Sequence, residues 1–290
     1  MPSKDKIWTI GEIIEQTKQY LAKYEVSSPR LDAEILLCSI LGQERIYLYV
    51  NFDQPLQKKE VDLYRELVLR RAKGEPIAYI LGKKAFLNVE LSVNKHVLIP
   101  RPETELLAEQ AIKFCQECDK VSLLDIGTGS GALVVSITHN CPNVTAVACD
   151  VSSEALAVAK ENAAKYNLSE RIEFVQSDVY ARLQGKKFSL IVSNPPYIIS
   201  KEIADLAREV QNEPVLALDG GEDGLAVYRR IVQKGKDFLL QDGLLALEIG
   251  YNQAEALTEL ASEAKFVNVK VIKDYAGLDR IVLMSDGKLD

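Results

Sequence analysis

Residues 121–131 read Val-Ser-Leu-Leu-Asp-Ile-Gly-Thr-Gly-Ser-Gly, and this stretch decides the fold. The apolar run over 121–126 predicts a buried strand. Gly127, Gly129 and Gly131 predict a tight turn with backbone conformations closed to other residues, and a helix follows at once. A strand, a glycine turn and a helix in this order indicate an α/β domain whose turn approaches a bound ligand.

Helices and strands alternate on both sides of this turn. Periodicity predicts helices over 102–118, 130–139, 153–167, 224–239 and 252–263, and strands over 121–126, 144–149, 171–176, 187–193, 243–249, 266–273 and 279–285. This alternation predicts a mostly parallel sheet with helices on both faces. No crossover helix fits between the last two strands, so we expect them to pair antiparallel at one edge.

The front of the chain has a different pattern. Apolar residues at helical spacing over 10–24 predict one helix, Ser28-Pro29 and Gly42 bound a second, and a third runs over 57–73 and stops at Gly74. Alternation after Lys83 predicts a β-hairpin that ends at Pro100-Arg-Pro. We therefore expect a helical bundle over 1–82, a hairpin linker over 83–100 and an α/β domain over 101–290.

Composition excludes several classes of protein. The 290 residues are 47% hydrophobic and 27% charged, which is typical of globular proteins, and the net charge is −7. Residues 1–85 carry a net charge of +2 and residues 86–290 a net charge of −9, so we expect no direct nucleic-acid binding. No apolar run is long enough for a membrane span and no leader is recognisable, and the odd count of five cysteines fits reduced thiols. We expect a cytoplasmic protein.

Metal and redox sites are not expected. Cys115 and Cys118 form a C-x-x-C pair, but they fall at the predicted carboxyl end of a helix, where the dipole does not activate a thiol, and no second pair exists for zinc.

The glycine loop predicts the cofactor. Its spacing is G-x-G-x-G, whereas a dinucleotide fingerprint has G-x-G-x-x-G. Asp125 places a carboxylate near the turn, which suits the cationic end of S-adenosylmethionine better than a pyrophosphate. Asp150 ends the next strand, 19 residues after Gly131, where it can bind both ribose hydroxyls. The alternative is a glycine turn used only for packing.

A third strand end extends this site. Asp178 follows the strand over 171–176 and is expected to face the adenine ring, with Val179 packed against it. A helix N-cap at Asp178 is the alternative.

Residues 194–197, Asn-Pro-Pro-Tyr, end the strand over 187–193 and predict the acceptor site. The two prolines stiffen the loop. The Asn194 side-chain oxygen and the Pro195 carbonyl can accept both hydrogens of a planar –NH2 group and orient its nitrogen toward a methyl sulfonium. Tyr197 would form one wall. A plain turn is the alternative.

Together these motifs resemble the protein-(glutamine-N5) methyltransferases that act on class I peptide-chain release factors. Arg30-Leu-Asp-Ala-Glu34 and Glu75-Pro-Ile-Ala-Tyr79-Ile-Leu-Gly82 are similar to motifs in the N-terminal domain of this family. Leu98-Ile-Pro-Arg101-Pro-Glu103-Thr-Glu105 is similar to the junction between the family's two domains. Its catalytic core is similar to the motifs above and to Glu213-Pro214. The Asn-Pro-Pro-Tyr tetrad alone is shared with adenine-N6 DNA methyltransferases.

The resemblance implies a Rossmann-like class I S-adenosylmethionine-dependent methyltransferase behind an N-terminal helical domain that helps to bind the release factor. The implied substrate is the glutamine of the Gly-Gly-Gln motif. The motifs and the resemblance together give the expected site residues. They are Asp125, Gly127, Thr128, Gly129, Ser130, Gly131, Asp150, Asp178, Val179 and Asn194 for the cofactor, and Asn194, Pro195, Pro196 and Tyr197 for the glutamine amide, with Asn194, Pro195 and Tyr197 catalytic.

Several alternatives stay open at this point. The acceptor could instead be adenine N6 in nucleic acid or a glutamine of another translation protein, and an inactive binding module is a further possibility. Arg101 and Glu103 either line the site or cap the helix that opens at Pro102. The preferred release factor and the oligomeric state are not predicted.

Overall fold

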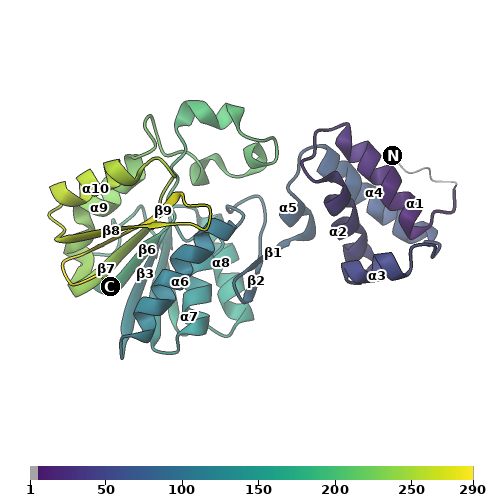
Figure 1. Cartoon of the computed structure of the whole chain (residues 1–290). Coiled ribbons are helices and arrows are strands. Elements are labelled where there is room, and N and C mark those ends of the chain that lie inside the picture. Colours follow the sequence, from purple (N-terminus) through teal and green to yellow (C-terminus); the bar gives the residue numbers. More distant parts are fainter. Residues whose placement is uncertain (1–5, 290) are drawn as a thin grey trace. The chain divides into compact units, whose positions relative to one another are not determined.

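The structure, a computed structural model, describes residues 6–289 and divides into two compact units. One unit holds the described residues up to Gly82 together with Ala207–Asn212, and the other holds Lys83–Leu206 and the described residues from Glu213 onward. Figure 1 shows both units, coloured along the chain.

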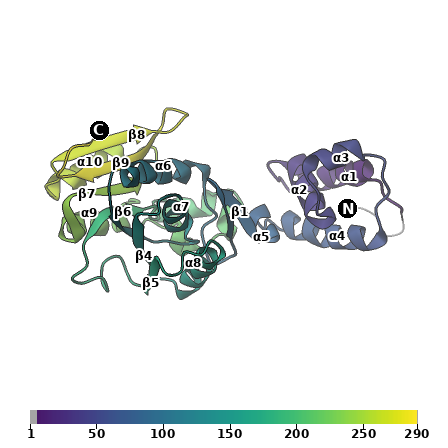
Figure 2. The same cartoon turned by 90° about the horizontal axis from the view of Figure 1, so that it is seen from below.

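The first unit is built of helices (Figure 2): α1 (Ile10–Ala22), α2 (Pro29–Leu41), α3 (Arg45–Val50), α4 (Lys58–Ala72) and α5 (Ile77–Leu81). The predicted helices α1, α2 and α4 are confirmed, and Gly42 ends α2 in the left-handed region. The Ser28 hydroxyl, in contrast, makes no capping hydrogen bond. Helices α3 and α5 were not predicted because six and five residues are too few to show an apolar period.

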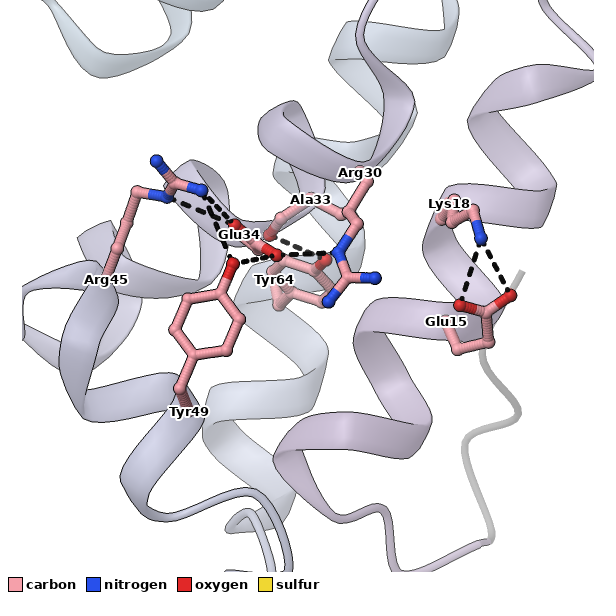
Figure 3. Close-up of polar contacts among 8 residues, drawn as sticks. All are labelled: Glu15, Lys18, Arg30, Ala33, Glu34, Arg45, Tyr49 and Tyr64. Carbon is pink, nitrogen blue, oxygen red and sulfur yellow. Dashed lines mark hydrogen bonds and ion pairs between the residues drawn. The ribbon is translucent and has the colours of Figure 1, made fainter.

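A buried carboxylate links two helices of this unit (Figure 3). Glu34 on α2 accepts hydrogen bonds from Arg30, Arg45 and the Tyr49 hydroxyl. Burial alone would raise the pKa of Glu34, but the hydrogen bonds from Arg45, Arg30 and Tyr49 lower it. The carboxylate therefore stays charged and ties α2 to α3.

A segment from much later in the chain completes the helical unit. Arg71 on α4 is almost fully buried and pairs with Asp32 on α2 and with Glu209. The Asn212 side-chain Nδ2 donates to the Gly74 carbonyl at 3.1 Å. These contacts explain why 207–212 belong to this unit.

The second unit is built around a seven-stranded sheet in the order β5-β4-β3-β6-β7-β9-β8. The strands are β3 (Val121–Ile126), β4 (Val144–Asp150), β5 (Ile172–Gln176), β6 (Phe188–Ser193), β7 (Leu239–Glu248), β8 (Asn268–Lys273) and β9 (Asp279–Ser285). All pairs from β5 to β7 are parallel, and β9 runs antiparallel to both β7 and β8. The predicted alternation and the antiparallel pairing of the last two strands are confirmed.

Helices cover both faces of this sheet (Figure 1). Residues of α6 (Pro102–Gln116), α7 (Ala132–Asn140) and α8 (Ser153–Lys165) share one apolar core with the sheet and with the predicted hairpin, β1 (Lys83–Phe86) and β2 (Val89–Ser92). Residues of α9 (Ala226–Phe238) and α10 (Ala254–Glu263) share the core on the opposite face. Short 3₁₀ turns lie at Ser200–Asp205, Val210–Asn212 and Val215–Ala217. None of the helices within residues 6–289 has both the length and the apolar character to cross a bilayer.

Candidate active site

A cavity of about 350 Å³ opens at the carboxyl ends of β3, β4 and β6. From β3 the chain continues to β4 and β5 on one side and then returns to β6 on the other side of β3. Open α/β sheets bind their ligands at the point where the strand order reverses in this way. Its lining includes Asp125, Gly127, Thr128, Gly129, Ser130, Asp150, Asp178, Val179, Asn194 and Pro196. The fold therefore brings together the two predicted halves of the site, the glycine loop and the proline-rich tetrad.

The glycine loop is held against the end of β4. The amides of Gly127 and Thr128 donate to the Cys149 carbonyl, at 2.8 and 3.0 Å. Gly127 and Gly129 have positive φ, and a Cβ at Gly127 would meet no atom within 4 Å, so the backbone here borders open space. Gly131, in contrast, is absent from the described cavity lining, and a Cβ there would press on Ala159 and Val135 at 3.2 Å.

Asp125 lies fully buried beneath this loop. Its Oδ2 accepts hydrogen bonds from the Thr128 hydroxyl at 2.7 Å and from the Val134 amide at 3.2 Å. Its Oδ1 is buried and has no hydrogen-bond partner within the described chain. Burial raises the pKa of Asp125 to about 7, against the lowering effect of these two hydrogen bonds. An oxygen left in this state suits a cationic partner supplied by a ligand.

Asp150 at the end of β4 braces the loop from the other side. Its Oδ2 accepts from the Gly129 amide at 2.9 Å and its Oδ1 from the Ser152 amide at 3.0 Å. Burial raises its pKa, while these backbone hydrogen bonds lower it. A carboxylate offers about four acceptor positions, so both oxygens can accept further hydrogen bonds on the cavity side.

Asp178 and Val179 border the cavity in a strained turn. The alternative of a helix N-cap at Asp178 is wrong, because within the described residues the next helical turn begins only at Ser200. Asp178 instead forms an ion pair with Arg230 at 2.6 Å. Val179 has φ +51°, which is rare for a β-branched residue and occurs where the surroundings enforce it.

The tetrad at the end of β6 is held on several sides. Asn194 and Pro196 line the cavity, whereas Pro195 and Tyr197 are absent from its described lining. The Gln253 side-chain amide donates to the Tyr197 carbonyl at 3.3 Å. Gly224 lies so close that a Cβ there would stand 2.5 Å from the same carbonyl oxygen. The backbone after Asn194 therefore has little room to move.

One residue that sequence reasoning did not single out on its own supports Asn194. The Asn194 Nδ2 donates to the Thr104 hydroxyl at 3.0 Å. Thr104 lies on α6 and is remote from the tetrad in sequence. No local pattern marked it as a partner of Asn194.

The linker between hairpin and helix α6 forms another wall. Residues 95–98 and Pro100 line the cavity, and His96, which had no predicted role, is among them. Arg101 and Glu103 are not part of the described lining. Arg101 instead pairs with Glu213, whose other oxygen accepts from the Ile99 amide at 2.9 Å. Glu213 therefore fastens the linker, and Arg101 makes no side-chain cap for α6.

Comparisons with known proteins agree with this architecture. The family profile of the PrmC N-terminal domain matches residues 12–82, and that of the methyltransferase small domain matches residues 103–278. The release factor glutamine methyltransferase of Geobacter sulfurreducens is 40% identical over 283 residues, which cover 97% of this chain and 98% of that protein. That of Moorella thermoacetica is 38% identical over 276 residues, covering 95% and 98%.

This chain belongs to the release factor glutamine methyltransferase family. It is an S-adenosylmethionine-dependent methyltransferase, and the family resemblance seen in the sequence is confirmed. A bifunctional methyltransferase of Rickettsia felis is 37% identical over 306 residues, and the match covers 96% of this chain and 58% of that protein. A methyltransferase structure from Pyrococcus furiosus has the same fold, with a TM-score of 0.51 and 19% identity over 71% of this chain and 92% of that one.

The cavity fits the family's cofactor on its own chemistry. The unpartnered Asp125 Oδ1 suits an ammonium group, and Asp150 suits a pair of ribose hydroxyls. The open space beside Gly127 leaves room for a ligand at the loop. When bound, S-adenosylmethionine supplies an electrophilic methyl group on a sulfonium.

Proposed function

We propose that this chain methylates the side-chain amide nitrogen of the glutamine in the Gly-Gly-Gln motif of class I peptide-chain release factors, with S-adenosylmethionine as the methyl donor. One observation supports this choice of acceptor above all. Asn194 lies in the same cavity as the glycine loop, and its Nδ2 is engaged by Thr104, which leaves Oδ1 as the group offered to a substrate.

An acceptor oxygen at this place helps to overcome the low nucleophilicity of the substrate amide. An amide nitrogen is a poor nucleophile because its lone pair is delocalised into the carbonyl group. The Asn194 Oδ1 and the Pro195 carbonyl oxygen would each accept one N–H of the glutamine amide, so that the nitrogen is held in one orientation. Positioning of this kind can contribute on the order of 7–11 kcal/mol to lowering a barrier.

The same oxygens stabilise charge that develops during transfer. The nitrogen–carbon bond forms as the carbon–sulfur bond breaks, so the amide nitrogen becomes positive and acidic and then loses a proton. Two acceptors aimed at its hydrogens stabilise that charge, and preorganised groups are especially effective in a site shielded from water. No titratable base is needed before transfer.

We assign the cofactor to the other end of the cavity. Asp125 would bind the ammonium group, Asp150 the ribose hydroxyls, and Val179 the adenine ring, with the backbone and side chains from Gly127 to Gly131 around them. Tyr197 would contact the flat amide of the substrate. We further propose that the helical unit binds the body of the release factor and that the reaction takes place in the cytoplasm.

Labelled methyl transfer to purified release factor tests this function. We expect label in a release factor with Gly-Gly-Gln, located by mass spectrometry on the glutamine, and none after Gln→Glu or Gln→Ala in that motif. A site that binds N–H groups can reject an analogue lacking them by about 10⁴–10⁵. Label that persists in both changed factors would contradict the proposal, and so would transfer to adenine in DNA or RNA at a comparable rate.

A further inference from the structure

The Glu213 carboxylate joins two segments of the chain that border the cavity. Its Oε2 accepts from the Ile99 amide at 2.9 Å, and its Oε1 pairs with the Arg101 guanidinium. Pro100, which lies between these two partners, lines the cavity, and so does Pro214, which follows Glu213. Glu213 is 4% exposed, so little water competes for these bonds. The linker before α6 is therefore bonded to the segment after Glu213.

On the linker side, hydrogen bonds lead from Arg101 to Asn194. Arg101 is the N-cap residue of α6, and its carbonyl accepts from the Thr104 amide at 3.1 Å. The Thr104 hydroxyl in turn accepts from the Asn194 Nδ2 at 3.0 Å. A displacement of Arg101 would therefore move the first turn of α6, and with it the side chain that holds Asn194.

On the other side, backbone hydrogen bonds lead from Glu213 to the tetrad. Residues 214–218 form a compact turn with internal backbone hydrogen bonds of 2.9 Å. The Ile198 amide donates to the Leu218 carbonyl at 3.0 Å, and the Gly220 amide donates to the Ile198 carbonyl at 2.8 Å. Because Ile198 directly follows the tetrad, this segment holds the backbone of the tetrad at its far end.

Together these contacts form a closed ring around the acceptor end of the cavity. The ring contains, in order, Asn194, Thr104, Arg101, Glu213, residues 214–218 and Ile198. In a ring each support is held from both sides, whereas two separate supports can move independently. A reacting constellation has to be held to within about 0.5 Å, so this difference matters for catalysis. Without Glu213 the ring would be open.

Stability alone is a weak explanation for a carboxylate at this place. Taking a charged group out of water is costly, and replacing a buried ion pair by apolar residues is often neutral or stabilising. Geometry is a better explanation, because hydrogen bonds to a charged group are short, strong and directional. Glu213 binds a backbone amide and a guanidinium at once, and it thereby fixes the linker on both sides of Pro100.

We propose that Glu213 is a positioning residue, which closes this ring and thereby holds Asn194 in place for methyl transfer. The inference rests on the proposed function, because it concerns the same acceptor site. Glu213 is absent from the described cavity lining, and no contact with substrate or cofactor is assigned to it. Its effect reaches the reacting atoms through Arg101 and Thr104.

Variants at both ends of the ion pair test this link. Glu213→Gln keeps the shape and one acceptor oxygen, but its NH2 group opposes one of the two donors. Arg101→Met removes the guanidinium, whereas Arg101→Lys keeps a charge for a pair that uses one guanidinium nitrogen. We expect kcat at saturating substrates to fall about 10- to 100-fold in Glu213→Gln and Arg101→Met, and less than about threefold in Arg101→Lys.

Calorimetry with S-adenosylmethionine counts the folded molecules and separates positioning from cofactor binding. The Kd should change less than about threefold in all three variants, because Asp125 and Asp150 are not members of the ring. The Arg101 side chain is 31% exposed, so Arg101→Met remains a usable test if Glu213→Gln does not fold.

Glu34→Gln is the matched control. Glu34 is as deeply buried as Glu213 and also pairs with arginines, but its partners Arg30 and Arg45 lie in the helical unit (Figure 3). The same substitution therefore removes a buried charge without opening the ring. We expect Glu34→Gln to leave kcat at saturating release factor within about threefold of the parent protein.

The decisive measurement is a double-mutant cycle between Glu213→Gln and Thr104→Val. Thr104→Val breaks the same ring at another point, so we expect it to lower kcat about tenfold or more. Once the ring is open, a second break should add little. We expect the double variant to have a kcat within about threefold of the slower single variant, whereas independent effects would multiply.

An unchanged kcat in Glu213→Gln or Arg101→Met would overturn the inference, and so would fold-changes that multiply in the double variant. A purely structural role for Glu213 predicts a lower unfolding temperature with an unchanged kcat per binding-competent molecule. Failure of the proposed function would look different, because the parent protein itself would then show no transfer to release factor.

Discussion

The two ends of the cavity are built in different ways. At the end of β3 and β4, one short stretch supplies most of the lining, and Asp125 and Asp150 hold it mainly through backbone amides and one neighbouring hydroxyl. At the end of β6, the tetrad is held by side chains and glycines that are distant in sequence, among them Thr104, Gly224 and Gln253.

This difference matches what each end has to do. A cofactor that is bound and released needs matching hydrogen-bond groups, and a local loop can supply them. A reluctant amide nitrogen needs one fixed orientation, and that requires support from several elements at once. We therefore expect changes at the first end to act mainly on cofactor affinity and changes at the second end to act mainly on the rate of transfer.

Asn194→Ala gives the largest expected effect. It removes one of the two proposed acceptors, and loss of a single preorganised hydrogen-bonding group typically lowers kcat by about 10²–10³. Affinity for S-adenosylmethionine, measured by calorimetry, should change by less than about threefold. A variant with normal turnover would exclude the proposed pair of acceptor oxygens that holds the substrate amide. A variant that loses cofactor binding instead would abolish the distinction between the two ends.

Asp150→Ala is the reciprocal experiment. Hydrogen bonds to a charged group contribute about 1.5–3 kcal/mol, so we expect affinity for S-adenosylmethionine to weaken by about 10- to 100-fold. The rate at saturating cofactor should change much less. Asp150→Asn keeps one carbonyl acceptor and should fall between the parent protein and Asp150→Ala. Unchanged affinity would place the ribose elsewhere.

The same difference decides how much could be predicted from sequence. The sheet, its helices and the glycine loop were predictable because local periodicity and spacing encode them, and the strand over 121–126 was predicted with its observed ends. Helices α3 and α5 were too short for this. Thr104 could not be assigned because its importance comes from meeting Asn194 in space, and no local pattern encodes a contact between residues 104 and 194.

Arg101 illustrates the same limit. Its place in a distinctive motif suggested a role in the site or in capping, whereas its side chain pairs with Glu213, more than a hundred residues away. The segment 207–212, which clusters with the helical unit, was not foreseen for the same reason.

Two glycines with the same backbone conformation sharpen the comparison at the acceptor end. Gly224 has φ +76° and Gly277 has φ +80°, so alanine at either position costs about 1–2 kcal/mol of stability from the left-handed backbone. Only at Gly224 would the new Cβ approach the Tyr197 carbonyl oxygen, to 2.5 Å, whereas a Cβ at Gly277 would meet nothing within 4 Å. We expect Gly224→Ala to lower kcat about tenfold, through displacement of the tetrad, and Gly277→Ala to leave it unchanged.

Calorimetric titration of cofactor into both variants shows whether they are folded. Equal rates per binding-competent molecule would mean that methyl transfer tolerates a displacement of the tetrad. The acceptor end would then be no more sensitive to small structural changes than the cofactor end.

The smallest expected effect is a pH dependence at the cofactor end. Burial raises the pKa of Asp125 to about 7, with the nearby Asp150 charge acting in the same direction. The folded protein therefore holds a proton here that an unfolded chain would release near pH 4, so this group favours folding at low pH and that contribution is lost as pH rises through about 7. A cation bound at Oδ1 requires the ionised form. Affinity for S-adenosylmethionine should consequently rise about fivefold from pH 6 to pH 7.

Two controls isolate Asp125 as the cause. Asp125→Asn should show a flat affinity over this range, and it should lack the parent protein's loss of stability between pH 5 and 7 that comes from this group. 5′-Methylthioadenosine carries the same nucleoside without the ammonium group, so its affinity should not follow the Asp125 titration in either protein. If this neutral ligand shows the same pH dependence as the cationic one, the titrating group contacts the nucleoside and not the ammonium group. Asp150, whose pKa burial also raises, would then be the carboxylate responsible, and the unpartnered oxygen of Asp125 would not be the ammonium site.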